Sequence, residues 1–496
     1  MKKNISFLFL LTVYLLLLIS CRNRTTSIMI YFSADVDYVT VSDPELNVCF
    51  EGFVDTFFLD SSKKLALRLN LEEDRFFVLE IPNRKKSWIL PIESGGDYNI
   101  SISEDNTLSV TGLNIQGILQ YQSALNYYPG QIDWQMFKND SMGCGEIIEK
   151  VKQDEIEVFR KLLKEKKITL PFFKLIENDR NCFYAFVDAW LNLREVMSII
   201  RKGDSETDES KTIEIMERLA SLFNKYNPNN ASMMNSPSWF DYAVFMYIQA
   251  YSRFSNDQVN KENIEELFSE KHIPFWFEQI KKLFSGKSLE SALSTFLYKQ
   301  GGEEGSIDSE ASISVYKFFK EEFPNSSYLK YFQKYMENTI AFYEEKTMNP
   351  SIHIIEDDSV HTFSELIAQF KGKKIYVDVW ALWCGPCRAE FKYKAALEKI
   401  LEKEGITPVY IVLAEAEDEK RWRATVNINE LKGYHFRANH QFQEKLKKIY
   451  NADPDIEKKE GGRGFSIPWY LLIDENGQII ERHGKRPSEI VSKGKW

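Results

Sequence analysis

Residues 374–387 read KIYVDVWALWCGPC, a β-favouring run that leads directly into two cysteines separated by two residues. Most of its first seven residues are aliphatic or aromatic, which is typical of a buried strand. Four further segments continue the pattern, two strand-like and two helical: 408–413, 470–473, 389–402 and 441–450. This alternation predicts an α/β domain over residues 349–496.

The pair Cys384 and Cys387 is the most specific chemical signal in the chain. Two thiols at this spacing at a helix start can close a disulfide and reopen it. Cys384 would lie at the helix N-terminus, where free amide groups and the helix dipole stabilise a thiolate and lower its pKa below about 8.5. Cys387, one turn further on, would be shielded and would attack the mixed disulfide to release a partner.

Half of a zinc site is the competing interpretation of the cysteine pair. A four-ligand zinc site needs a second pair of Cys or His at compatible spacing. His435 and His440 lie five residues apart without a second cysteine pair beside them. The pattern therefore favours redox chemistry and predicts no metal.

Length and charge limit the classes of protein that fit. The chain has 496 residues, which suggests about three domains, and six cysteines, too few for a disulfide scaffold. The net charge of −10 argues against a nucleic-acid partner. Residues 371–496 hold 24 Lys and Arg against 19 Asp and Glu, a balance of +5, so residues 1–370 carry −15.

Residues 27–113 are predicted to form a β-rich accessory domain. Short strand-like runs are separated by turn residues, at 28–32, 64–69, 75–81, 98–102 and 108–110. This spacing predicts a small antiparallel sandwich. We find no catalytic constellation in it.

Residues 114–348 are predicted to be α-helical. Apolar residues recur at the spacing of one helix face at Ile148, Val151, Val158, Phe159 and Leu162. Aromatic stripes in this region fit a helix-packing core better than a ligand groove.

The N-terminus has the layout of a secretory signal. Lys2 and Lys3 precede an apolar run at 5–19, which ends at Cys21 in a sequence that resembles a bacterial lipobox. An uncleaved membrane anchor is the alternative interpretation of residues 1–21. Both predict a cell-envelope protein anchored to a membrane, and we expect a lipoprotein lipidated at Cys21 that faces the periplasm.

Residues 377–387 resemble the active-site stretch of the thioredoxin superfamily, and Gly372-Lys373-Lys374 is similar to the strand entry of TlpA/ResA-like membrane-tethered thiol–disulfide oxidoreductases. The leader and the β-rich and helical regions resemble the large multidomain members common in Bacteroidetes. The specific part of the resemblance covers residues 350–490. It implies a C-terminal thioredoxin-like fold and an enzyme that reduces protein disulfides without a cofactor, supplied by an upstream membrane electron donor.

The resemblance also assigns roles to single residues. Cys384 matches the nucleophile and Cys387 the resolving thiol. Pro468, after Ile467, matches the family's cis-proline, which helps to dock the partner's extended backbone. Asp378 matches the buried acid that accepts a proton from the resolving thiol, and its place in a buried strand predicts a raised pKa.

Residues around the dithiol are expected to contact the substrate. Trp383, Gly385, Pro386 and Ile467 are the candidates. For Trp383, simple packing is an equally good interpretation.

Two departures from the family pattern affect these expectations. Thioredoxin pairs its buried acid with a Lys on the next central strand, whereas residues 408–419 contain no Lys and offer Glu415. Residues 451–464 are longer than a usual connection into the cis-proline strand. They are interpreted as a surface loop, with partner binding as the alternative.

Cys49, Cys144 and Cys182 remain after these assignments, so at most one further disulfide can form. A Cys144–Cys182 bond and independent buried thiols are both open. The second functional hypothesis is an extracytoplasmic binding lipoprotein whose N-terminal regions recognise a protein or glycan, with the thioredoxin-like domain as an accessory.

Overall fold

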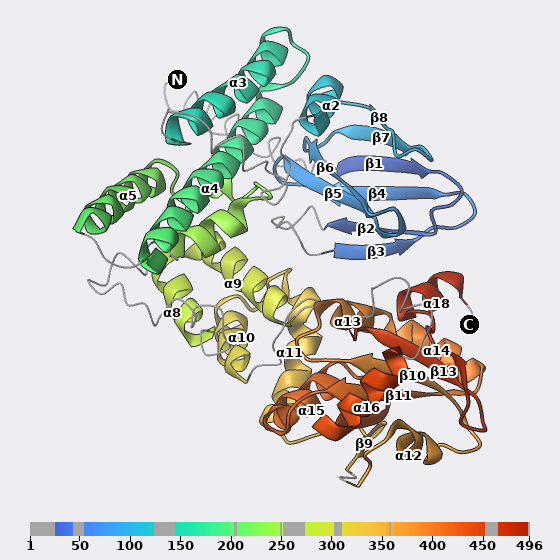
Figure 1. Ribbon diagram of the computed structural model, residues 1–496. Helices are drawn as coiled ribbons and strands as arrows, with labels where there is room; N and C mark the ends of the chain where they lie inside the picture. The colour runs from blue at the N-terminus through green and yellow to red at the C-terminus, as the bar shows by residue number, and fades with distance from the viewer. Residues whose placement is uncertain are drawn as a thin grey trace, which may run out of the picture. The chain divides into compact units, whose positions relative to one another are not determined.

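The computed structural model describes nine segments of the chain (Figure 1): 25–42, 54–123, 144–202, 206–248, 250, 273–301, 310–356, 359–451 and 465–494. The chain divides into two compact units. The first comprises Met1–Leu267 and Glu278–Ala292, and the second Phe268–Phe277 and Leu293–Trp496. The expected leader with Cys21 lies outside the described residues, as do Cys49 and residues 452–464.

Two four-stranded sheets begin the described part of the first unit, and their strands are β1 (Thr25–Phe32), β2 (Tyr38–Ser42), β3 (Val54–Phe58), β4 (Lys64–Asn70), β5 (Arg75–Ile81), β6 (Lys86–Ile92), β7 (Asp97–Ile102) and β8 (Leu108–Thr111). One sheet has the order β4-β1-β7-β8 and the other β3-β2-β5-β6. The expectation of an antiparallel sandwich is wrong for one pair, because β1 and β7 are parallel. The five intervening strands supply the long connection that a parallel pair needs.

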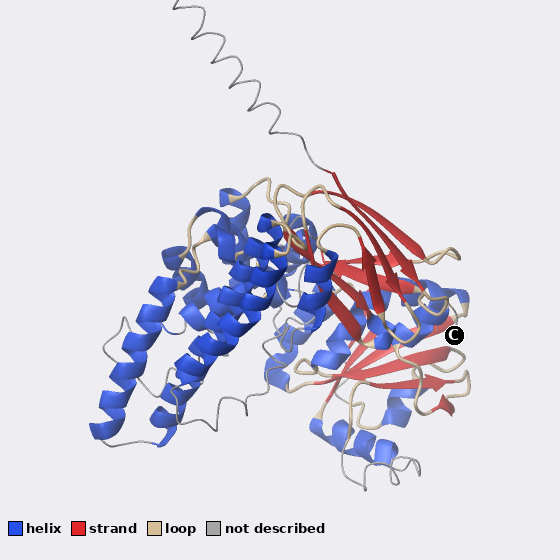
Figure 2. Cartoon of the chain, turned by 90° about the horizontal axis from the view of Figure 1, so that it is seen from above, coloured by secondary structure: helices blue, strands red, loops and turns tan. Residues whose placement is uncertain are grey.

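The helices that follow the sheets, shown in blue in Figure 2, are α2 (Ile115–Ser123), α3 (Cys144–Lys164), α4 (Leu170–Lys202), α5 (Glu206–Lys225), the π-helix η4 (Asp241–Tyr247), α8 (Ile273–Leu283), α9 (Gly286–Gly301), α10 (Ala311–Glu322) and α11 (Leu329–Tyr343). Helices α8 and α9 cross the division between the two units. Residues of the strands and of α2, α3 and α4 share one hydrophobic core. None of the described helices is both long and apolar enough to span a membrane.

The buried face of α3 differs from the predicted one. Ile148, Ile156 and Phe159 are buried, whereas Val158 is 41% exposed. Lys152 is buried between Ile148 and Ile156 in the sequence, and its Nζ donates to Glu149 and to the hydroxyl of Tyr226. Because the polar residue Lys152 lies on the buried face of α3, the spacing of apolar residues alone does not show which face is buried.

Cys182 on α4 is a free, fully buried thiol, and burial raises its pKa. A bond between Cys144 and Cys182 is therefore not formed. Cys144 begins α3, and its side chain lies outside the described set.

A six-stranded sheet forms the C-terminal part of the second unit, in the order β14-β13-β10-β11-β12-β9. Its strands are β9 (Ile352–Ile355), β10 (Lys374–Trp380), β11 (Ile406–Leu413), β12 (Gly433–Ala438), β13 (Trp469–Ile473) and β14 (Ile479–Glu481). Its helices are α12 (Phe363–Ala368), α13 (Gly385–Ala389), the 3-10 turn η6 (Glu390–Tyr393), α14 (Lys394–Lys403), the 3-10 turn η7 (Ala416–Asp418), α15 (Glu419–Ile428), α16 (His440–Asn451) and α18 (Pro487–Lys493).

Parallel pairs join β10, β11, β12 and β9, and β13 runs antiparallel to β10. The predicted fold class is confirmed, with N-terminal sheets, a helical middle region and a C-terminal α/β thioredoxin-like fold.

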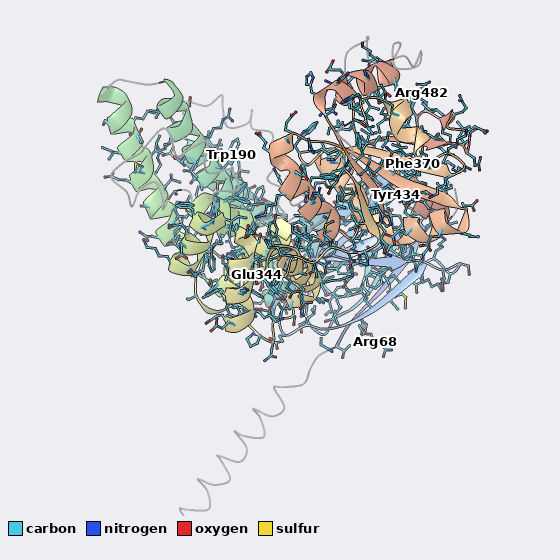
Figure 3. The ribbon with its side chains drawn as sticks, turned by 90° about the horizontal axis from the view of Figure 1, so that it is seen from below. Arg68, Trp190, Glu344, Phe370, Tyr434 and Arg482 are labelled. Carbon is cyan, nitrogen blue, oxygen red and sulfur yellow. A yellow bond between two sulfur atoms is a disulfide. The ribbon has the colours of Figure 1, made fainter. Side chains whose placement is uncertain are left out.

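The central strand β10 separates two faces of this sheet, because successive side chains of a strand point to opposite sides. The residues that pack with α12 and α16 are Ile375, Val377 and Val379. On that side Phe370, just after α12, packs edge-on against Tyr434 of β12, with ring centroids 5.0 Å apart (Figure 3). The residues that point to the other face are Tyr376, Asp378 and Trp380, and Trp380 packs with the two cysteines.

Candidate active site

The two cysteines lie where the central strand ends and a short helix begins. Cys384 is the N-cap residue of α13, with the extended backbone that this position requires (φ −85°, ψ 92°). The backbone N–H of Cys387 donates to Sγ of Cys384 at 3.2 Å. The same N–H can stabilise a thiolate at Cys384 after reduction, because an amide donor at a helix start favours the charged form.

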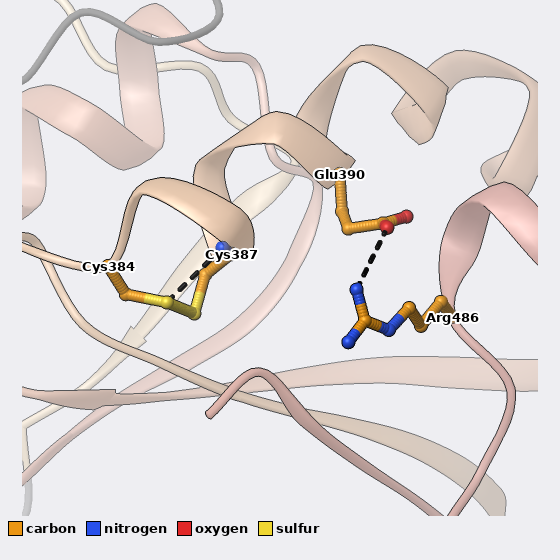
Figure 4. Close-up of a disulfide and its surroundings, with 4 residues drawn as sticks. All are labelled: Cys384, Cys387, Glu390 and Arg486. Atoms are coloured by element: carbon orange, nitrogen blue, oxygen red, sulfur yellow. Dashed lines mark hydrogen bonds and ion pairs between the residues drawn. A yellow bond between two sulfur atoms is a disulfide. The ribbon is translucent and has the colours of Figure 1, made fainter. Parts of the chain in front are cut away.

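Cys384 and Cys387 are joined by a disulfide in the structure (Figure 4). They are 4% and 1% exposed, whereas the neighbouring Trp383 is 73% exposed. Gly385 and Pro386 occupy the first turn of α13 and are also exposed. A Cβ on Gly385 would meet no atom within 4 Å, so the surface beside the disulfide is open there.

The peptide bond between Ile467 and Pro468 is cis, as the resemblance implies. It directly precedes β13, and Trp469 at the start of β13 is paired with Val379 near the end of β10. Ile467 packs against the hydrophobic cluster that contains both cysteines. The cis-proline segment and the disulfide are thus brought together from distant parts of the sequence.

Asp378 is 4% exposed and points to the same face of the sheet as Trp380, which packs with the two cysteines. Within the part of the chain that the structure describes, its Oδ1 has no hydrogen-bond partner. In register with it lie Tyr410 on β11 and Tyr470 on β13. Burial first, and the nearby Glu390 carboxyl second, raise the pKa of Asp378 well above 3.8.

Glu390 is a buried carboxyl that the sequence reasoning missed. Its two oxygens accept hydrogen bonds from the backbone N–H and the hydroxyl of Ser488 at 2.8 and 3.0 Å. Arg486 lies 3.9 Å away (Figure 4). Its signal in the sequence is the spacing from Cys387, since residues three apart share a helix face, but its partners on α18 are visible only in the fold.

The position of the expected lysine partner is taken by an aromatic residue. Tyr410 is the β11 residue in register with Asp378, and its ring stacks on His435 with centroids 4.6 Å apart. Glu415 lies beyond the end of β11, is exposed, and is not brought to Asp378. His435 is fully buried, and its Nε2 lies 2.7 Å from the carbonyl oxygen of Leu431.

A groove of about 680 Å³ opens beside the disulfide. It is lined by Leu382, Trp383, Leu413, Ala414, Glu415, Asp418, Gln443, Lys447, Asn451, Phe465 and Ile467. The groove therefore joins the residue before Cys384 to the residue before the cis-proline.

Comparison with known proteins places this region in a family. The Redoxin family model matches residues 356–492. The thiol-disulfide oxidoreductase ResA of Geobacillus kaustophilus is 24% identical over 113 residues, which cover 23% of this chain and 55% of that protein. The thioredoxin-like protein YneN of Bacillus subtilis is 31% identical over 115 residues, 23% of this chain and 57% of that protein.

Among solved structures, the solution structure of a putative thiol-disulfide oxidoreductase from Bacteroides vulgatus is 31% identical, covering 26% of this chain and 73% of that one, with a TM-score of 0.20. The chain spans little more than half the length of the curated relatives it matches. The matched region belongs to the thioredoxin superfamily, as a Redoxin domain similar to the TlpA/ResA-like thiol–disulfide oxidoreductases.

Proposed function

We propose that the protein is a membrane-anchored thiol–disulfide oxidoreductase that reduces protein disulfides in the periplasm through Cys384 and Cys387. The observation that carries the proposal is the position of Cys384 as a helix N-cap with the Cys387 amide directed at its Sγ. The segment before β13, whose Ile467 packs against the cluster that contains both cysteines, and the buried carboxyl of Asp378 support the proposal.

The reaction transfers two electrons from the reduced dithiol to the substrate. The Cys384 thiolate attacks one sulfur of the substrate disulfide, that S–S bond breaks, and the first substrate thiolate leaves and takes up a proton. Cys387 gives its proton to the Asp378 carboxylate, and its thiolate attacks Sγ of Cys384. The second substrate thiolate then leaves, and the bond between Cys384 and Cys387 seen in the structure is formed.

The reduced dithiol must be regenerated by a donor of two electrons and two protons, and we propose that this donor acts across the membrane. Exposed Trp383, Gly385 and Pro386, with Ile467, form the proposed contact surface for the substrate. We further propose residues 27–113 and 114–348 as accessory domains and 349–496 as the redox domain, tethered through Cys21.

Reduction of insulin by the full chain, with dithiothreitol as the reductant, tests the activity. Cys384→Ser should abolish dithiol-dependent turnover. Cys387→Ser should also abolish turnover but should trap a mixed disulfide through Cys384. The buried Cys182 offers a matched control, because Cys182→Ser removes a thiol that the reaction does not use. Wild-type protein that shows no turnover above the reductant alone would refute the proposed activity.

Membrane attachment is tested separately by fractionation of cells that produce the wild type or Cys21→Ser. The wild type should sediment with membranes and the variant should be released. Equal sedimentation of both proteins would refute anchoring through Cys21.

A further inference from the structure

The groove beside the disulfide is lined by apolar residues from the segment before Cys384 and from the segment before Pro468. Leu382 and Trp383 form its end at the disulfide, and Phe465 and Ile467 bring the segment before β13 to it. Trp383 is mostly exposed, so its ring is available to a bound chain. Apolar lining residues of this kind can contact the aliphatic and backbone parts of an extended polypeptide.

The lining residues that follow β11 and lie in the turn η7 include two acids. Glu415 and Asp418 both line the groove. Among the described residues, neither carboxylate has an ion-pair partner, whereas the next acid along the chain, Glu419, is held by Arg423 at 2.7 Å. Within the described part of the groove, these two carboxylates therefore have no basic partner.

The lining residues from α16 do not neutralise the charge of Glu415 and Asp418. Lys447 on α16 is the one basic residue that lines the described groove, and its Nζ lies 2.7 Å from Oε1 of Glu444. The remaining polar lining residues, Gln443 and Asn451, are uncharged amides. The described lining of the groove therefore combines a net negative charge with apolar side chains.

A long basic side chain complements both features, because Lys and Arg lay an apolar stem along apolar surface and keep the charged end near polar groups. An acidic side chain bound in the same place would be repelled by the two carboxylates and would also lose part of its hydration. The surrounding domain is mildly basic, with 24 Lys and Arg against 19 Asp and Glu in residues 371–496, so the acidity of this lining is a local feature.

We propose that this groove binds the polypeptide on either side of the substrate cysteine and selects substrates that carry Lys or Arg there. The inference rests on the proposed disulfide reductase activity and names the class of substrate that the enzyme prefers. Glu415 and Asp418 are specificity-determining residues in this proposal and take no part in the sulfur chemistry.

The test compares the reduction of peptide disulfides that differ only in the residues flanking the cysteine: two Lys, two Glu or two Gln. At low ionic strength the full-length wild type should show a kcat/KM roughly tenfold higher for the Lys peptide than for the Glu peptide, because two exposed charge pairs contribute modestly. The ratio should fall towards one as salt is added.

The double variant Glu415→Lys/Asp418→Lys should lose or invert this ratio. The matched control is Glu404→Lys/Glu475→Lys, which changes the net charge equally at two exposed residues of the same domain outside the groove. The control should retain the wild-type ratio.

The outcomes separate the two claims. Absence of turnover for all three peptides refutes the proposed reductase activity. Turnover with equal kcat/KM for the Lys and Glu peptides, or a ratio that changes equally in the groove variant and in the control, refutes the selectivity and leaves the reductase activity standing.

Discussion

The buried carboxyl of Asp378 should make the stability of the C-terminal domain depend on pH, and the substitution Asp378→Asn should remove this dependence. Asp378 is buried, its Oδ1 has no hydrogen-bond partner among the described residues, and burial together with the charge of Glu390 raises its pKa well above 3.8. The unfolded chain has neither influence, so there the carboxyl ionises near its ordinary value.

The sign follows from the raised pKa. Above pH 3.8 the unfolded chain has released a proton that the folded domain still holds at Asp378. The contribution of Asp378 to the free energy of unfolding is therefore fully present below that pH. It is lost as the pH rises, by about 1.4 kcal/mol per pH unit, until Asp378 ionises in the folded domain as well. Asp378→Asn has no proton to exchange, so its stability relative to the wild type should increase by the same amount per unit.

Native-state hydrogen exchange of peptides from β10 and β11 measures the opening of this domain in the oxidised full chain. Comparison of wild type and variant at the same pH cancels the intrinsic pH dependence of exchange. The free-energy difference between Asp378→Asn and wild type should grow from pH 5 to pH 6, by at most about 1.4 kcal/mol. Glu475→Gln, at an exposed turn residue, is the control and should show no such growth. A difference between Asp378→Asn and wild type that stays constant over this interval would show that Asp378 is already ionised in the folded domain and refute the reasoning.

Two further predictions concern groups buried elsewhere. Burial lowers the pKa of His435 from 6.5 to about 3, so its contribution to stability is complete above pH 6.5 and declines by about 1.4 kcal/mol per unit below it; His435→Gln should remove this decline in the same exchange experiment, and an unchanged slope would contradict it. In the first unit, the carboxylate of Asp179 accepts hydrogen bonds from Tyr121, Ser236 and the fully buried Arg180. Asp179→Ala should destabilise this unit by about 3–5 kcal/mol because it leaves a buried cation without its main partner, and a loss below about 1 kcal/mol in urea unfolding would show that Arg180 finds water.

The local chemistry of the dithiol could be predicted because it depends on neighbours in the chain. The motif Cys384-Gly385-Pro386-Cys387, placed directly after a predicted strand, was enough to predict that a helix begins at Cys384 with Pro386 in its first turn. The burial of Asp378 follows from the β10 pattern in the same way. Ile467 and Pro468 are far from this stretch in the sequence, and only the resemblance to a family connected them with it.

The features of the site and the fold that could not be predicted depend on contacts between segments far apart in the sequence. Ser488 reaches Glu390 across 98 residues, and neither a carboxyl nor a serine at those positions signals the other. Tyr410 replaces the expected lysine beside Asp378, and only the strand register shows which residue of β11 faces the acid. The parallel pairing of β1 with β7 likewise depends on the whole connection between them.

The replacement of a lysine by Tyr410 changes how the buried acid can act. A cation in register with Asp378 would favour its ionised form, whereas Tyr410 and Tyr470 in register offer no positive charge, and Glu390 adds a negative one. The two carboxyls differ in their hydrogen bonds. Glu390 accepts two from Ser488 and has Arg486 within 3.9 Å, whereas Oδ1 of Asp378 has no partner in the described part of the chain. The raised pKa of Asp378 therefore has no cation in strand register to oppose it, unlike the buried acid of the family pattern.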